Sequence, residues 1–477
     1  MTARRTRCTM TTARRMGGKA QIFTKERIVF YSIKHDFLFF LEILCIFAKT
    51  YLLTFSMRNL SFITVLCCVA FLASCCNKSN PTPFPEVSEP IAITRGPKDH
   101  LFASYYGINS WSPDNRYVTV LETNITDRLS EDGEYATIAL VDLQDNNKLI
   151  PVAKTCTWNF QEAAMCHWLP WAEDTFLFND KRDGKFVTVI LNWKTGEEKI
   201  IPYPVSAVSK DGEWAISINY ARLRISRPDY GYAGEGQDAQ RDVAWPENDG
   251  LWLVNLKSGE AKLILTVASL KEQMTQMDDP RGMAYFCHTV FNPSATKIFF
   301  LARTVENLDA QTKKVSKWKT TSFTCDVDGS NVRRCFPDGW GGSHFNWKDD
   351  ETLAVTAKWE DRVYGHVIFT VGEEEKVQHI GAGILDFDGH CLFSPNGKFM
   401  SSDGYYKKKV FERPWVLVRL EDQAIMPLGA YYVPEIYRNT YSRCDLHPRF
   451  RPDGKQIGFN SVHEGSRQVY IRDIEWK

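Results

Sequence analysis

A short motif recurs seven times along this chain of 477 residues. In each copy an aromatic or apolar residue leads into a turn built from Pro, Asp, Lys or Gly, as in residues 111–114 and 450–454. Such turn residues commonly punctuate β-strands, and a unit repeated about every 40 to 50 residues is typical of the four-stranded blades of β-propellers. The register position, three residues before the turn-entry residue, is occupied by Ile108, Met165, Val205, His288, His344, His390 and His447.

Strand-type runs fill the intervals between the motif copies. Residues 116–121, 186–191 and 297–301 are rich in β-branched and aromatic side chains. The longest interval, between residues 205 and 288, must hold an insertion, and residues 263–276 within it are the one predicted helix. We therefore predict an all-β fold, a seven-bladed β-propeller over residues 91–477, in which the motif strand of each blade lines a central channel.

The N-terminal part has the features of an export signal. Met57 and Arg58 precede an apolar run over residues 60–72, which is short for a membrane span and is followed by Ala-Ser-Cys75. This pattern resembles a bacterial lipobox. We predict a lipoprotein signal peptide over residues 57–75 with lipidation at Cys75, and an ordinary signal peptide is the alternative. The lipid would anchor the protein to a membrane of the bacterial envelope, with the outer membrane favoured because no aspartate follows Cys76.

The segments beside this signal, the charge and the cysteines set further limits. Residues 1–56 are interpreted as an upstream extension from a misplaced start codon, with a signal-anchor helix over residues 37–55 as the alternative. Residues 76–90 are polar and proline-rich and predict a flexible tether. Lys+Arg and Asp+Glu are equal at 58 each, which argues against a nucleic-acid partner, and we expect a monomer. Cys325 and Cys335 flank a hairpin turn and either form a disulfide or remain free thiols.

Histidine occupies the register position in four successive motif copies. If the blades are equivalent and close into a ring, His288, His344, His390 and His447 converge at one mouth of the channel. Neutral imidazole is a common ligand of divalent transition metals. The four residues therefore predict a metal site. The alternative is a buried stack of histidines and cysteines that satisfy one another and trapped water.

These His-x-x-aromatic strand entries, together with residues 453–455 and 463–470, resemble the propeller polysaccharide lyases, above all the oligogalacturonate lyases. TolB-like propellers share the turn repeats. The resemblance implies that His288, His344 and His447 hold a divalent metal, typically manganese, and that His390 is an additional or replacement ligand. Where that family has glutamine, three residues before the last histidine, this chain has Cys444. Because thiolate favours softer ions, zinc is an alternative to manganese.

An eliminating lyase needs a group that neutralises the uronate carboxylate, a base for the C5 proton and help for the leaving oxygen. Residues 220–232 carry three arginines and three tyrosines, and arginine binds carboxylates in bidentate fashion. The alternative is a solvated edge whose arginines pair with nearby carboxylates. We predict catalytic roles for Arg222, Arg227 and Tyr230, and substrate contacts for Tyr220, Arg224, Tyr232 and Trp340.

The resemblance favours a lyase that cleaves an acidic, uronate-containing oligosaccharide by metal-assisted β-elimination. Two alternatives stay open: a propeller glycoside hydrolase acting at rhamnose–glucuronate linkages, and a non-catalytic, TolB-like binding propeller. A propeller peptidase is disfavoured because the chain carries no Gly-x-Ser-x-Gly motif.

Overall fold

The structure is a computed structural model that describes residues 80–278, 282–306, 317–359, 364–404, 411–438 and 441–477. The predicted upstream extension, the signal peptide and Cys75 lie outside the described residues. Residues 81–477 form one compact unit. Within the described part of the chain, no helix is long and apolar enough to cross a membrane.

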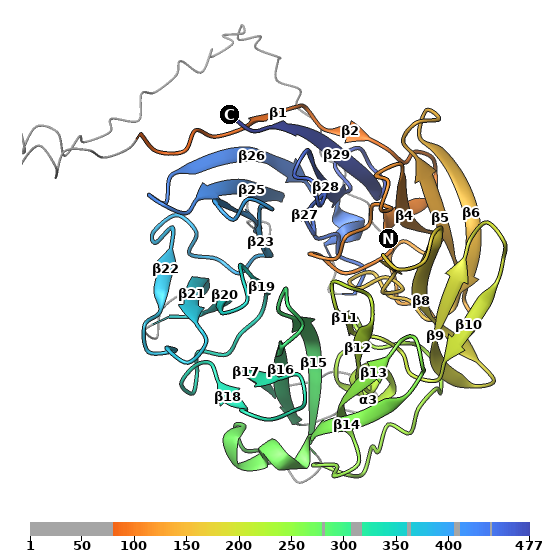
Figure 1. The fold of residues 1–477 in the computed structure, drawn as a ribbon, viewed down its shortest axis with the longest axis vertical. Coiled ribbons are helices and arrows are strands. Elements are labelled where there is room, and N and C mark those ends of the chain that lie inside the picture. The colour runs from red at the N-terminus through yellow and green to blue at the C-terminus, as the bar shows by residue number, and fades with distance from the viewer. Residues whose placement is uncertain (1–79, 279–281, 307–316, 360–363, 405–410, 439–440) are drawn as a thin grey trace, which may run out of the picture. The chain divides into compact units, whose positions relative to one another are not determined.

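Seven antiparallel sheets surround a central channel, which confirms the predicted all-β, seven-bladed β-propeller (Figure 1). Each of the first six blades consists of four strands that follow one another in the chain, so every connection within a blade joins sheet neighbours. Blades one to three contain β3 (Asp99–Phe102), β4 (Tyr117–Thr123), β5 (Ala136–Asp142), β6 (Lys148–Thr155); β7 (His167–Trp168), β8 (Thr175–Arg182), β9 (Lys185–Asn192), β10 (Glu198–Ile201); and β11 (Ala207–Val208), β12 (Trp214–Ser217), β13 (Gly250–Asn255), β14 (Ala261–Thr266).

The next three blades follow the same plan. Figure 1 shows β11, β15, β19, β23 and β27 around the centre of the ring. The strands of blades four to six are β15 (Met283–Phe291), β16 (Lys297–Glu306), β17 (Lys317–Asp326), β18 (Arg333–Arg334); β19 (Phe345–Trp347), β20 (Thr352–Lys358), β21 (Tyr364–Thr370), β22 (Gln378–Ile380); and β23 (Cys391–Phe393), β24 (Phe399–Asp403), β25 (Glu412–Arg419), β26 (Ile425–Tyr432).

The seventh blade joins the two ends of the described chain. It contains β27 (Arg449–Phe450), β28 (Gln456–Ser461) and β29 (Gln468–Glu475), and two N-terminal strands, β1 (Glu86–Val87) and β2 (Ile91–Ala92), pair antiparallel with β29. Val87 lies opposite Ile474, and β1 runs along β29 in Figure 1. The ring therefore begins within the predicted tether, since residues 86–87 already belong to a sheet.

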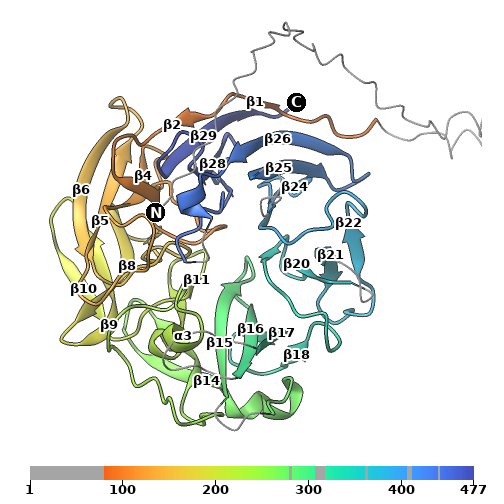
Figure 2. The same cartoon turned by 180° about the vertical axis from the view of Figure 1, so that it is seen from behind.

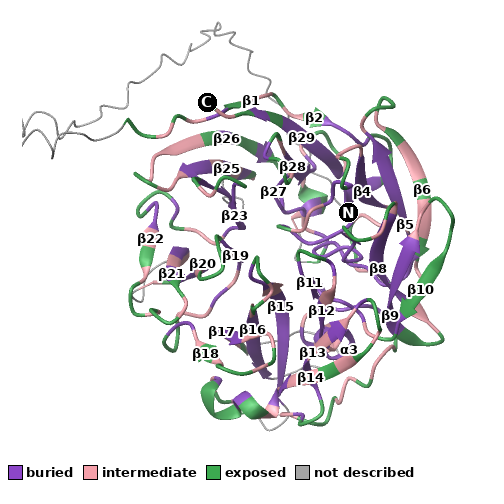
Figure 3. Ribbon diagram, viewed as in Figure 1, coloured by how far each residue is buried: buried purple, intermediate pink, exposed green. Residues whose placement is uncertain are grey.

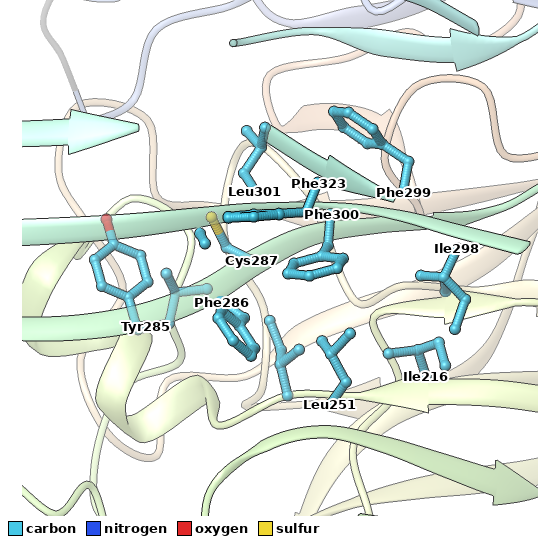
Figure 4. Packing of buried hydrophobic residues seen from close by; sticks show 14 of the residues in the cluster. Ile216, Leu251, Tyr285, Phe286, Cys287, Ile298, Phe299, Phe300, Leu301 and Phe323 are labelled. Carbon is cyan, nitrogen blue, oxygen red and sulfur yellow. The ribbon is translucent and has the colours of Figure 1, made fainter. Parts of the chain in front are cut away.

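Apolar side chains fill the space between neighbouring blades. Phe286 of β15 and Phe300 of β16 pack with ring centroids 5.1 Å apart, and Phe300 stacks on Phe323 of β17 at 5.6 Å (Figure 4). Leu251 and Ile216 of the preceding blade belong to the same cluster. Inner strands are buried, whereas the residues of the outermost strands β6, β10 and β26 are mostly exposed or half-buried (Figure 3). The apolar area removed from water therefore lies in the inner strands, and the outer strands form the solvated rim of the ring.

The predicted helix over residues 263–276 is wrong. That stretch is the end of β14 followed by a 3-10 turn, η1 (Ala268–Gln273); a second short 3-10 turn is η2 (Glu435–Tyr437). The one α-helix among the described residues is α3 (Tyr220–Ser226), which lies beside the third blade in the reverse view (Figure 2). Asn219 caps it by accepting from the backbone N–H of Arg222 at 3.0 Å, a strong helix-start signal.

The described cysteines are all free and buried, so Cys325 and Cys335 are not bridged. The disulfide interpretation of that hairpin is wrong, and its free-thiol alternative holds. Burial raises the pKa of both thiols, to about 12 for Cys325, which keeps them protonated and unreactive.

Candidate functional site

The four register histidines converge at the channel, as the repeat predicts. His288 lies in β15, and His344, His390 and His447 lie at or just before the starts of β19, β23 and β27. All four are buried. The ring centroids of His344 and His390 are 3.9 Å apart, and those of His390 and His447 are 4.4 Å apart. The equivalence of the blades therefore brings together side chains that are separated by more than a hundred residues.

Two of these histidines have a backbone conformation that is unusual for a side-chain-bearing residue. His288 has φ of 55° and His447 has φ of 47°, and Met165, at the same register position, has φ of 53°. In β15 the pairing register shifts between Cys287 and Val290, so His288 lies at a bulge. Positive φ in a non-glycine residue costs free energy and clusters at functional sites. Three of the seven register positions share this conformation.

Three side chains could together hold a metal ion. Ligand atoms of His390, Asp445 and His447 lie within 4.8 Å of one another, and Nε2 of His447 is 4.0 Å from Oδ2 of Asp445. Among the described residues, Nε2 of His447 has no hydrogen-bond partner although it is buried. Nδ1 of His390 is 2.8 Å from Oδ1 of Asp403, which leaves Nε2 as its ligand atom. A carboxylate that orients a histidine in this way is a common feature of metal sites.

The charge states in this group suit a metal ligand set. Burial lowers the pKa of His447 well below its usual value and also lowers that of His390, so both imidazoles are neutral near pH 7. Burial opposes ionisation of Asp445, but Arg413 at 2.7 Å and Arg443 hold the pKa of Asp445 far below its ordinary value. Two neutral imidazoles and an ionised carboxylate are the forms that bind divalent ions.

Cys444 is not part of this group. Its thiol donates to the backbone oxygen of Asp445 at 3.8 Å and packs with Val433, Tyr437 and Val462. Burial raises the pKa of Cys444 to about 11, so it carries no thiolate near neutral pH. The cysteine ligand expected from the sequence is therefore absent from the three-residue group. The oxygen ligand comes from the next residue, Asp445, whose position two residues before His447 was the available signal.

His288 and His344 line a neighbouring cavity of about 270 Å³ and are not members of the three-residue group. The cavity also receives three guanidinium groups, from Arg227, Arg303 and Arg443. Tyr230, Trp318, Tyr364 and Asp388 complete most of its wall. It is a pocket of positive charge, imidazole and aromatic surface.

Ion pairs fix two of these arginines. Asp229 accepts from Nε and Nη2 of Arg227 at 3.0 and 2.8 Å, and from Nη1 of Arg443 at 3.2 Å. Burial alone would raise the pKa of Asp229, but the two guanidiniums bring it to about 2. Nη2 of Arg443 also donates to the hydroxyl of Tyr230 at 3.1 Å. Arg227, Tyr230 and Arg443 therefore form one preorganised wall.

His344 is oriented by a carboxylate. Its Nδ1 lies 2.9 Å from Oδ1 of Asp388, and the hydroxyl of Thr356 donates to the same oxygen at 2.8 Å. Burial opposes ionisation of Asp388, but His344 and these hydrogen bonds hold its pKa at about 2. Because an ionised carboxylate only accepts, Nδ1 of His344 carries the hydrogen, and in the neutral ring Nε2 carries the lone pair.

The arginines of α3 are structural. Arg222, predicted to be catalytic, is buried and donates to the backbone oxygens of Ala239, Gln240, Val243, Ala244 and Ala284 at 2.7 to 3.1 Å. Arg224, predicted to bind substrate, donates to the backbone oxygens of Pro228 and Ser130. Both expectations are corrected, because a helix replaces the exposed strand or loop assumed for this stretch and directs the side chains to backbone acceptors.

The predicted aromatic contacts also lie elsewhere. Tyr220 and Tyr232 are fully buried and stack with centroids 4.2 Å apart, and the hydroxyl of Tyr220 donates to the backbone oxygen of Val205. Trp340 stacks on Phe336 at 5.7 Å and does not line the cavity. Of the seven predicted catalytic and substrate contacts, only Arg227 and Tyr230 reach it. Sequence reasoning missed Arg303, Trp318, Tyr364 and Asp388 and gave Arg443 no role, because nothing in their local sequence marks them as cavity residues.

A second cavity, of about 530 Å³, is lined by residues of the turns that follow the motif strands, including Pro113, Pro293 and Pro452. Tyr105 and Tyr106 line it and also contact the histidines. The ring centroids of Tyr105 and His288 are 5.6 Å apart, and those of Tyr106 and His390 are 4.6 Å apart. The tyrosine pair therefore lies between this cavity and the imidazoles.

The fold and the site define a seven-bladed β-propeller with a histidine-carboxylate group and a cationic cavity at its channel. No protein-family model matches the chain, and no curated protein matches it. Among solved structures, it is similar to an oligogalacturonate lyase in complex with manganese, with 15% identity and a TM-score of 0.57 over 83% of this chain and 96% of that one. An oligogalacturonate lyase from Vibrio parahaemolyticus is similar at 14% identity and a TM-score of 0.53, over 82% and 97% of the two chains. The chain thus shares the propeller fold of these lyases.

Proposed function

We propose that this propeller is a lyase that cleaves a uronate-containing oligosaccharide by β-elimination with the help of a divalent metal. The observation that carries the proposal is that Arg227, Arg303 and Arg443 line the same cavity as His288 and His344. Guanidinium groups bind and neutralise a carboxylate, which acidifies the proton on the carbon beside it. The fold shared with oligogalacturonate lyases supports the same class of reaction.

His344 is the group that would accept the C5 proton. Asp388 holds its Nδ1–H, so the Nε2 lone pair is the basic position, as in other carboxylate-oriented histidine bases. Tyr230 is suited to the opposite task. Burial raises the pKa of Tyr230, so its hydroxyl keeps its proton at neutral pH and can donate it to the leaving oxygen.

His390, Asp445 and His447 would hold the metal. A bound divalent ion would supply Lewis-acid stabilisation of the negative charge that develops beside the substrate carboxylate. The donor set of two nitrogens and one carboxylate suits manganese or zinc, and the manganese of the similar lyase favours the former. The unpartnered Nε2 of His447 supports this assignment because a buried polar atom without a partner is costly.

The test is incubation of the purified protein with digalacturonate and other uronate oligosaccharides in the presence of Mn²⁺. A lyase produces an unsaturated uronate, whose conjugated double bond absorbs in the ultraviolet. His344→Gln should abolish the absorbance increase while the metal content is unchanged. Failure to form an unsaturated product across a broad uronate panel, with metal bound, would overturn the proposal.

The same assay separates the alternatives. A glycoside hydrolase would release reducing ends without the double bond, and a binding propeller would do neither. Asp388 is the only carboxylate that lines the cavity among the described residues, which disfavours a hydrolase that needs two. The lipid anchor at Cys75 and the envelope location stay predictions from the sequence.

A further inference from the structure

The three guanidinium groups of the cavity differ in whether they form ion pairs with carboxylates of the protein. Arg227 forms a bidentate pair with Asp229, and Arg443 pairs with Asp229 and Asp445. Each of these two arginines is thus paired with at least one buried protein carboxylate. An incoming anion would therefore gain less from them than from an arginine without a carboxylate partner.

Arg303 is that arginine. Its side chain extends from β16 into the cavity wall and is 4% exposed, yet no described carboxylate forms an ion pair with it. Its Nε donates to the hydroxyl of Thr320 at 3.1 Å, which fixes the plane of the group. Nη1 has no hydrogen-bond acceptor among the described residues. A guanidinium is always charged, so a buried positive charge with an unused donor lies in the wall of the cavity.

Such an arrangement is unfavourable in the unliganded protein. A buried charge without a partner destabilises the folded protein, and an anionic ligand would compensate it. A carboxylate in the cavity would accept from Nη1 in a charge-assisted hydrogen bond. The centroid of the Trp318 ring lies 4.9 Å from the Arg303 guanidinium and 4.2 Å from that of Arg227, so the ring packs against both groups. Trp318 is itself 48% exposed and offers an apolar surface beside the charge.

We propose that Arg303 is the specificity-determining residue of the cavity, and that its unused donor edge binds the C6 carboxylate of a uronate residue in preference to a neutral or esterified sugar. This inference rests on the proposed function for the choice of a sugar acid as the ligand. It assigns the carboxylate to Arg303 and leaves Arg227 and Arg443 with the role of holding Tyr230 and Asp445 in place. Thr320 acts as a positioning residue through the Nε hydrogen bond.

Binding of a monosaccharide tests this without any turnover. D-galacturonate and its methyl ester are titrated into the metal-loaded protein, with binding followed by ligand-observed NMR. The wild type should bind the acid at least about tenfold more tightly than the ester, which is the loss expected for one charge-assisted hydrogen bond of about 1.4 kcal/mol. Arg303→Gln should abolish this preference, and Arg303→Lys should retain part of it.

Arg128→Gln is the matched control, because Arg128 is an exposed arginine paired with Glu134, and its replacement removes the same charge outside the cavity. Thr320→Val should weaken the acid preference partially. If the Arg303 variants unfold, the acid-against-ester comparison on wild type and on Thr320→Val still decides. Equal binding of acid and ester, absence of binding, or an unchanged preference in folded Arg303→Gln overturns the inference. A protein that prefers the acid but forms no unsaturated product would refute the lyase proposal and leave this one standing.

Discussion

The Nε atom of Arg443 donates to Oδ2 of Asp445 at 2.9 Å. The far end of the same side chain donates to Asp229 and to the hydroxyl of Tyr230, and Tyr230 lines the cavity of about 270 Å³. One guanidinium therefore links the proposed metal ligands to the proposed substrate cavity. In a buried region of low dielectric constant, this link couples the electrostatics of the metal site to those of the cavity. The binding of a metal ion should therefore change the affinity for a carboxylate ligand, and the reverse.

Replacement of His447 should remove the metal. We expect the purified protein to contain a divalent ion and His447→Ala to reduce the content to background, because one of three candidate ligands is lost. Elemental analysis measures this directly. His366→Ala is the matched control: His366 is equally buried, with Nε2 2.7 Å from the hydroxyl of Ser402, and lies outside the group. Equal metal loss in both variants would contradict the assignment.

Glu162 should make stability fall as the pH rises. It is buried, and burial, with a smaller effect of Asp229, raises the pKa of Glu162 from 4.5 to about 8. The folded state then holds a proton that the unfolded state has lost, so this stabilisation is complete below about pH 4.5 and is lost as the pH rises to about 8. The free energy changes by up to about 1.4 kcal/mol per pH unit.

Glu162→Gln should remove that pH dependence, because the amide is neutral throughout. Thermal unfolding of both proteins at pH 5 and pH 8 measures it. The variant should gain stability relative to wild type at the higher pH. Unfolding curves that shift in parallel would show that Glu162 titrates normally.

Arg222 should matter for stability and not for binding. Its guanidinium donates to five backbone oxygens, and Arg222→Leu leaves those buried acceptors without a partner. We expect a loss of about 3 kcal/mol or more in the free energy of unfolding, measured by denaturant titration. Arg222→Leu should still bind D-galacturonate wherever it remains folded. An Arg222→Leu protein that is stable but does not bind D-galacturonate would show that Arg222 contributes to substrate binding.

Tyr230→Phe should slow the formation of unsaturated product by on the order of 100-fold, the usual contribution of a proton-transferring group. The change removes one hydroxyl that accepts from Arg443 and should alter the melting temperature little. Tyr285→Phe is the control, because the Tyr285 hydroxyl is buried, has no partner among the described residues and does not line the cavity. Similar rates in Tyr230→Phe and wild type would exclude Tyr230 as the acid.

The sequence predicted the ring and its histidines because the repeat register carries both. Asp445 was not predicted as a ligand, because the position expected to hold a ligand was that of the preceding residue, Cys444. Arg303 and Trp318 escaped for a different reason: they lie in the middle strands of one blade, and strand alternation does not reveal which side chain reaches the channel. The catalytic role predicted for Arg222 was wrong, because the local sequence does not distinguish an arginine in a binding loop from one in a capped helix.

The pairing of β1 and β2 with β29 has a consequence for biosynthesis. β29 is the last strand to be made, so the first and last strands can meet only after nearly all of the propeller has left the ribosome. Single blades can fold during synthesis, but a polypeptide that lacks β29 cannot pair β1 and β2, so its ring stays open.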